Sequence, residues 1–65
     1  MDYGAEIRAE RARRRVTQPE LAERLGISRH TIVDIEAGRL QISADQFHRI
    51  LRALNEMGPM AVSRQ

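Results

Sequence analysis

Apolar residues recur at helical spacing in two short segments near the middle of the chain, and a glycine follows each segment. The residues concerned are Leu21, Ala22, Leu25 and Gly26 in the first segment, and Ile32, Ile35 and Gly38 in the second. Apolar residues three or four positions apart share one face of an α-helix. Glycine adopts the left-handed conformation that ends a helix at little steric cost. We therefore predict two helices, from about Gln18 to Leu25 and from about Arg29 to Ala37, separated by a tight turn.

Polar residues at the start of each segment support this assignment. Thr17 precedes the first segment with Glu20 three positions later, which is the spacing of a capping box, and Ser28 precedes the second. A threonine or serine at this position accepts a hydrogen bond from a backbone N–H that the helix leaves unpaired. Two short helices joined by a glycine turn, with a polar outer face on the second, are typical of a helix-turn-helix that inserts its second helix into the DNA major groove.

Two further helices are predicted on either side of this pair. The first extends from Asp2 to about Arg15, with Tyr3, Ile7 and Val16 as apolar anchors. The last begins after Ser43, whose capping-box partner is Gln46, and it carries Phe47, Ile50, Leu51 and Leu54 at helical spacing. The predicted fold is therefore all-α, a compact four-helix domain over residues 1–56. Residues 57–65 form a tail, since Gly58 and Pro59 discourage a continuous helix.

The central segment resembles the lambda/434 repressor and Cro class, the XRE-like helix-turn-helix family. The resemblance covers roughly Gly4 to Leu54, and Pro19 departs from it only within the first helical turn, where proline is tolerated. The residues that match the family pattern are Gln18, Glu20, Leu21, Ala22, Leu25, Gly26, Ile27, Ser28, Thr31, Ile32, Ile35, Glu36, Gly38 and Arg39. The resemblance implies sequence-specific binding of double-stranded DNA.

Candidate DNA contacts fall into two groups. Arg29, His30 and Asp34 match positions where relatives read base edges, and Val33 could contact a thymine methyl group. Arginine can bind guanine O6 and N7, and aspartate can accept from cytosine N4, although Asp34 could instead orient or neutralise His30. The candidate phosphate contacts are Thr17 and Gln18 at a helix N-terminus, where free N–H groups favour anions, and Arg39 and Gln41 in the following loop.

One ion pair is expected within the domain. In the resembling class an arginine at the place of Arg11 can pair with the glutamate near the end of the second helix of the motif, here Glu36. Glu36 shares a face with Ile32 and should point inward, and an inward carboxylate without a partner is costly. We therefore expect an Arg11–Glu36 pair between the first and third helices.

Composition limits the remaining function classes. The 65 residues include no cysteine, and His30 and His48 lie on different predicted helices, so the sequence predicts neither a metal site, a cofactor nor an enzyme. The net charge is +2, and all eleven basic residues are arginine. Arginine suits recognition of phosphate and guanine, but codon bias explains its exclusive use equally well. With no membrane span or signal peptide expected, the predicted location is cytoplasmic.

The tail suggests how the domain could assemble. Phe47, Ile50 and Leu51 already close the predicted core. We therefore predict a homodimer interface, formed by helix ends or by a short C-terminal strand, from the remaining apolar residues Leu54, Met57, Met60 and Val62. A frayed tail is the alternative. A dimer would act as a repressor on a palindromic operator. The tail also resembles that of antitoxins that bind both DNA and a toxin protein, and this is the alternative function.

Overall fold

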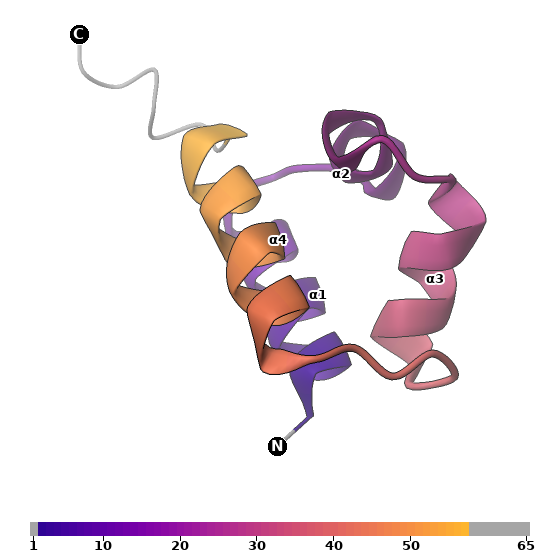
Figure 1. Ribbon diagram of the computed structural model, residues 1–65. Coiled ribbons are helices and arrows are strands. Elements are labelled where there is room, and N and C mark those ends of the chain that lie inside the picture. The colour runs from indigo at the N-terminus through magenta and orange to yellow at the C-terminus, as the bar shows by residue number, and fades with distance from the viewer. Residues whose placement is uncertain (1, 58–65) are drawn as a thin grey trace, which may run out of the picture.

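Four α-helices make up the part of the chain that the structure describes, residues 2–57 of a computed structural model (Figure 1). They are α1 (Tyr3–Arg13), α2 (Gln18–Leu25), α3 (Arg29–Ala37) and α4 (Ala44–Met57). The described residues contain no strand, which confirms the predicted all-α class. The proposed C-terminal strand, with Met60 and Val62, lies outside the described residues.

Polar caps begin the helices where the sequence predicted. Thr17 and Glu20 exchange side-chain and backbone hydrogen bonds of 3.2 and 2.8 Å at the start of α2. Ser28 accepts a hydrogen bond from the Thr31 N–H at 3.1 Å at the start of α3. Ser43 and Gln46 form the second capping box, before α4. These caps fix the bounds of α2 and α3 at the predicted residues.

The first three helices end in the same way, with one residue in the left-handed conformation. Gly26 and Gly38 take this role after α2 and α3, with φ of 73° and 82°. After α1 the left-handed residue is Arg15, with φ of 58°. The Val16 N–H donates to the Arg11 carbonyl, and the Arg15 N–H donates to the Ala12 carbonyl. This Schellman arrangement satisfies carbonyls that the helix leaves free. Consequently α1 ends at Arg13, two residues before the predicted end.

The core lies between the four helices and takes apolar residues from each. Its fully buried members are Ile7 from α1, Leu21 from α2, Ile32 from α3 and Leu54 from α4. The Tyr3 and Phe47 rings stack with centroids 4.3 Å apart and join α1 to α4. Leu54 therefore belongs to the core, and with 0% of its surface exposed it offers nothing for a second chain to contact. This corrects its predicted place at the dimer interface.

Close approach of α1 and α3 depends on Gly4. A Cβ atom at this position would lie 2.1 Å from the Ile35 carbonyl oxygen and 3.1 Å from its carbon, both in the backbone of α3. Such separations are far inside van der Waals contact, so only glycine fits here. The contact sets the position of α3, which packs against α1 and α2 and leaves its opposite side exposed.

Candidate nucleic-acid interface

The outer face of α3 carries the predicted base-reading residues. Ile32 and Ile35 point into the core, and Arg29, His30, Val33 and Asp34 lie elsewhere around the helix. Arg29 is exposed, His30 has 84% of its side chain exposed, and Val33 and Asp34 are half-buried. Burial of the isoleucines therefore fixes the rotation of α3 and presents Arg29 and His30 to solvent.

Asp34 contacts two residues of its own chain. Its Oδ1 accepts a hydrogen bond from Arg39 Nε at 3.1 Å, and its Oδ2 lies 3.5 Å from His30 Nε2. The latter is an ion pair only when the imidazole is protonated. The carboxylate thus lies between a candidate base-reading residue and a candidate phosphate contact. This geometry gives Asp34 an orienting role beside the predicted acceptor role for cytosine.

The candidate phosphate residues lie at the start of α2 and after the end of α3. Thr17 uses its backbone N–H and its hydroxyl oxygen in the capping box, so the hydroxyl hydrogen is its remaining donor. Gln18 is half-buried and donates from Nε2 to Glu36 Oε1 at 3.1 Å. Arg39 and Gln41 are both exposed in the loop after α3. The contact with Asp34 uses only Nε of Arg39, so the terminal guanidinium nitrogens stay available.

Arg11 and Glu36 form the expected pair between α1 and α3. Arg11 Nε donates to Glu36 Oε2 at 2.7 Å and Nη2 to Oε1 at 3.1 Å, a two-pronged contact. Arg11 Nη1 also donates to the Val16 carbonyl at 2.9 Å. Only 17% of the Arg11 side chain and 5% of the Glu36 side chain are exposed. Because Gln18 also reaches Glu36, one carboxylate connects α1, α2 and α3 behind the outer face of α3.

A shallow groove of about 560 Å³ adjoins this network, between α1, α2 and the outer side of α3. Thr17, Gln18 and Val33 line it, as predicted site residues, and so does Arg8 of α1. Sequence analysis gave Arg8 no role. It precedes Arg11 by three positions, a spacing that puts two residues on one helix face, and this was the signal that could have found it.

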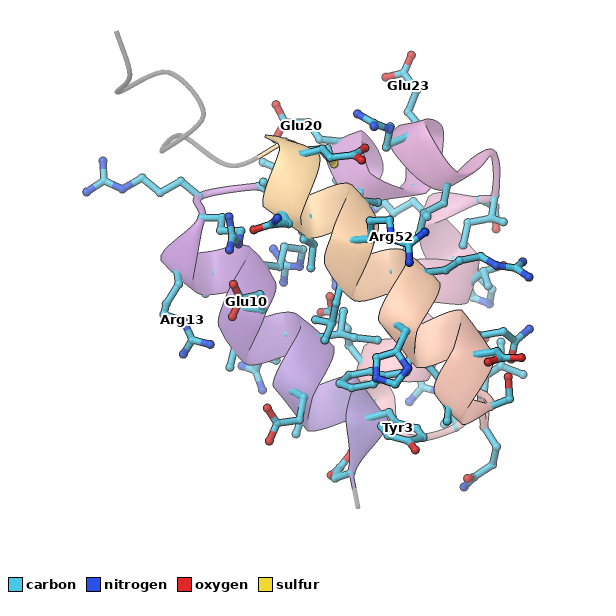
Figure 2. The ribbon with its side chains drawn as sticks, turned by 60° about the vertical axis from the view of Figure 1, so that its left-hand side comes forward. Tyr3, Glu10, Arg13, Glu20, Glu23 and Arg52 are labelled. Carbon is cyan, nitrogen blue, oxygen red and sulfur yellow. The ribbon has the colours of Figure 1, made fainter. Side chains whose placement is uncertain are left out.

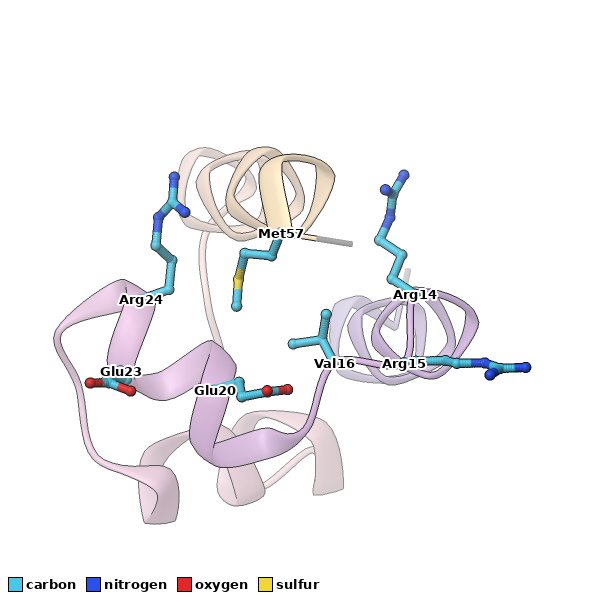
Figure 3. Close-up of a pocket in the computed structure, with 7 residues that line it drawn as sticks. All are labelled: Arg14, Arg15, Val16, Glu20, Glu23, Arg24 and Met57. Carbon is cyan, nitrogen blue, oxygen red and sulfur yellow. The ribbon is translucent and has the colours of Figure 1, made fainter. Parts of the chain in front are cut away.

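Of the other three residues predicted at the dimer interface, the structure describes only Met57. Met57 is half-buried and packs against the core at the end of α4. Figure 3 shows its side chain directed into the groove that Arg14, Val16, Glu20 and Arg24 help to line. Met60 and Val62 lie outside the described residues. Within residues 2–57, the large apolar side chains left exposed are instead Ile27 at 38% and Leu40 at 43%.

Other kinds of site find no support in the described residues. Between residues 2 and 57 no three His, Asp or Glu side chains are close enough together to hold a metal ion. No helix in that range is long and apolar enough to cross a membrane.

Comparison with known proteins identifies the family. A family model described as a helix-turn-helix domain matches residues 2–61. A protein of Methanothermobacter thermautotrophicus named as an uncharacterized HTH-type transcriptional regulator is 50% identical over 48 residues, covering 74% of this chain and 70% of that protein. No solved structure matches this chain. The four helices, the capped and glycine-terminated central pair and this match together show that the chain belongs to the helix-turn-helix domain family, a DNA-binding and non-enzymatic class.

Proposed function

We propose that the protein is a transcriptional repressor that binds double-stranded DNA sequence-specifically, as a homodimer on a palindromic operator. The observation that carries the proposal is the outer face of α3, where Arg29 and His30 are exposed on a helix held in place by the Arg11–Glu36–Gln18 network. A rigidly supported helix with polar outer side chains suits readout of base edges in the major groove. The role implies a cytoplasmic location.

In this proposal, one set of residues reads the bases and another contacts the sugar–phosphate backbone. Arg29, His30 and Val33 face the bases, and Arg29 binds guanine O6 and N7. Thr17, Gln18, Arg39 and Gln41 contact the sugar–phosphate strands and set the register. For Asp34, both acceptance from cytosine and orientation of its neighbours remain compatible with its contacts to His30 and Arg39.

The homodimer is proposed from the geometry of DNA and the small size of the domain. Recognition helices of two subunits about 34 Å apart enter successive major grooves on one face of the duplex. One subunit offers few phosphate contacts, so a second subunit supplies the affinity that a single domain lacks. Repression follows if the dimer covers a promoter, and the test is transcription in vitro from a template whose promoter overlaps the selected site.

Selection of bound sequences from a random duplex library gives the operator, and two variants then test the division of roles. Arg29→Ala should weaken binding to the selected site by about 1–3 kcal/mol and relax the preference at one base pair. Arg39→Ala should weaken binding to all sequences alike and reduce the salt dependence. Equal losses on selected and random duplexes for Arg29→Ala would refute its role in reading bases.

The antitoxin alternative gains no support from residues 2–57. The feature that suggested it is the tail, residues 57–65, of which residues 58–65 lie outside the described residues.

A further inference from the structure

The groove beside α3 contains an arginine, Arg8, that forms no ion pair within residues 2–57. Its walls include Arg8 and Arg11 from α1, Gln18 from α2 with the capping residue Thr17 before it, and Val33, Glu36 and Ala37 from α3. Arg11 is committed to Glu36 through two hydrogen bonds. Among residues 2–57, no acidic side chain forms an ion pair with Arg8, and Arg8 is exposed. The groove therefore carries an uncompensated positive charge at Arg8.

Other arginines of the domain are placed differently. Arg13 and Arg14 both bind Glu10, and Arg24 binds Glu56. These pairs neutralise the charges of Arg13, Arg14 and Arg24. Arg8 differs from them because it is both unpaired and next to the outer side of α3, where Val33 lies.

The dimensions of DNA place phosphates on this flank of α3. The major groove is about 12 Å wide, and a helix with its side chains is about 10–12 Å across. A helix seated in that groove therefore has a phosphate strand along each side. Arg8, Thr17 and Gln18 line one groove on a single side of α3, so one strand can meet all three.

We propose that Arg8 binds a backbone phosphate of duplex DNA, which extends the DNA-contacting surface from α2 and α3 onto α1. The inference rests on the proposed function, because it takes α3 as the helix that enters the major groove. A guanidinium pairs with phosphate oxygens through two parallel N–H donors, and the pairing is charge-assisted. The contact supplies affinity and register without reading sequence.

The test compares salt dependence of DNA binding for the full chain and three variants. The duplexes are the selected operator and a random-sequence duplex of equal length. Arg8→Ala should weaken binding to both by the same factor and reduce the slope of log K against log salt by about one unit. Arg8→Lys, which keeps the charge, should retain most of the slope.

Arg52→Ala is the matched control. Arg52 is also exposed and lacks an ion pair within residues 2–57, but it lies on α4 (Figure 2). It lines a different groove, with Glu10 and His48. The net charge changes equally in the two alanine variants, so a general electrostatic effect would alter both slopes alike. We expect the wild-type slope for Arg52→Ala.

Each outcome has a distinct meaning. A wild-type slope for Arg8→Ala, or equal losses for Arg8→Ala and Arg52→Ala, overturns the Arg8 contact and leaves the proposed function standing. Failure of the wild-type chain to bind any duplex at low salt overturns the proposed function and this inference with it. Thermal melting of each variant shows whether it is folded. If Arg8→Ala is unfolded, the slope of Arg8→Lys is compared with that of the wild type instead.

Discussion

At the scale of single residues, the clearest energetic difference lies between buried and exposed ion pairs. Arg11–Glu36 is almost enclosed, whereas Arg24 and Glu56 have 45% and 51% of their side chains exposed. An exposed pair contributes at most about 1 kcal/mol because water screens both charges. Removing one member of a buried pair costs more, since the other charge stays behind without a partner.

Glu36→Ala should therefore destabilise the domain by about 3 kcal/mol, because it strands the Arg11 guanidinium and frees the Gln18 amide. Glu56→Ala is the control, since it removes a carboxylate of the same kind from a solvent-exposed pair. Urea unfolding monitored by circular dichroism measures both. Similar losses for the two variants would contradict the bracing role of Glu36.

Glu10 gives a pH-dependent prediction. Hydrogen bonds from Arg13 and then Arg14 lower the pKa of Glu10 from its ordinary value of 4.5. A carboxyl whose pKa is lowered by folding stabilises the folded state above the unfolded pKa, and loses that contribution as pH falls through the folded pKa. Glu10→Gln should thus lower the melting temperature at neutral pH, and the difference from wild type should shrink as the solution is acidified below 4.5.

Glu6→Gln serves as its comparison. Glu6 lies one turn earlier on α1 and is exposed, without an ion pair among residues 2–57. Its replacement removes the same charge from the same helix, and the melting temperature should change less. A difference between wild type and Glu10→Gln that persisted in acid would show that the ion pairs of Glu10 are not its source.

At the scale of the helices, the close approach of α1 to α3 predicts that Gly4→Ala destabilises the domain, whereas helix propensity predicts the opposite. Alanine is favoured over glycine in a helix by about 1 kcal/mol, so propensity alone expects Gly4→Ala to stabilise α1. The Cβ of an alanine at this position would instead clash with the Ile35 backbone. Unlike a flexible side chain, this backbone cannot move away by changing rotamer. We expect a loss of about 1–3 kcal/mol, as for other overpacked contacts.

Ala5→Gly is the control for this helix. Ala5 is the exposed neighbour of Gly4, and its replacement should cost only the difference in propensity, about 1 kcal/mol. Thermal melting distinguishes the two effects. Increased stability in Gly4→Ala would mean that α1 and α3 do not approach as closely as the structure shows.

Sequence alone predicted the parts of the fold that depend on local chemistry. The bounds of α2 and α3 followed from their caps and glycines, since cap, turn and apolar spacing act within a few residues. The Arg11–Glu36 contact followed from the family resemblance together with the inward direction of Glu36. The first kind of signal is contained in short segments, whereas the second depends on a resemblance that spans most of the chain.

The features that sequence analysis missed depend on which helices meet. Gly4 matters only because α1 crosses the backbone of α3 at that point. Leu54 looked surplus until the structure placed it between the helices, and the contact of Asp34 with Arg39 depends on the path of the loop after α3. Arg8 gains its proposed role from the groove that α1 forms with α2 and α3. Arg8 and Leu54 each carry a local signal, their helical spacing from neighbouring residues, but that spacing does not say which helices meet.

At the scale of the whole molecule, ion pairs neutralise some arginines and leave others free of an ion pair within residues 2–57, on α3 and on other sides of the domain. The paired residues Arg14 and Arg24 also connect helices, since Arg14 Nη2 donates to Asn55 Oδ1 at 3.0 Å and Arg24 contacts Glu56. Exposed arginines without an ion pair in the described residues include Arg8 and Arg29, beside and on α3. A net charge of only +2 thus still leaves unpaired positive charge where the DNA is proposed to bind.

Dimer formation is predicted to depend on the tail, because two of the four residues predicted at the interface pack within their own chain. Leu54 is enclosed and Met57 packs partly inside its own chain, so Met60 and Val62 are the apolar residues of the predicted interface that remain. In a symmetric interface, both subunits would bury their own Met60 and Val62. A chain ending at Met57 should therefore sediment as a monomer at concentrations where the full chain is a dimer, and it should bind the palindrome more weakly.

The control for this deletion is the double variant Ile27→Ser and Leu40→Ser, which removes the large apolar side chains exposed in residues 2–57. It should remain dimeric if the tail holds the subunits together. Neither Ile27 nor Leu40 belongs to the buried core cluster, so the domain should stay folded. A shortened chain that dimerises and binds as tightly as the full chain would exclude the tail. A monomeric double variant would then assign the contact to the face around Ile27 and Leu40, because an exposed apolar surface gains free energy when a second copy covers it.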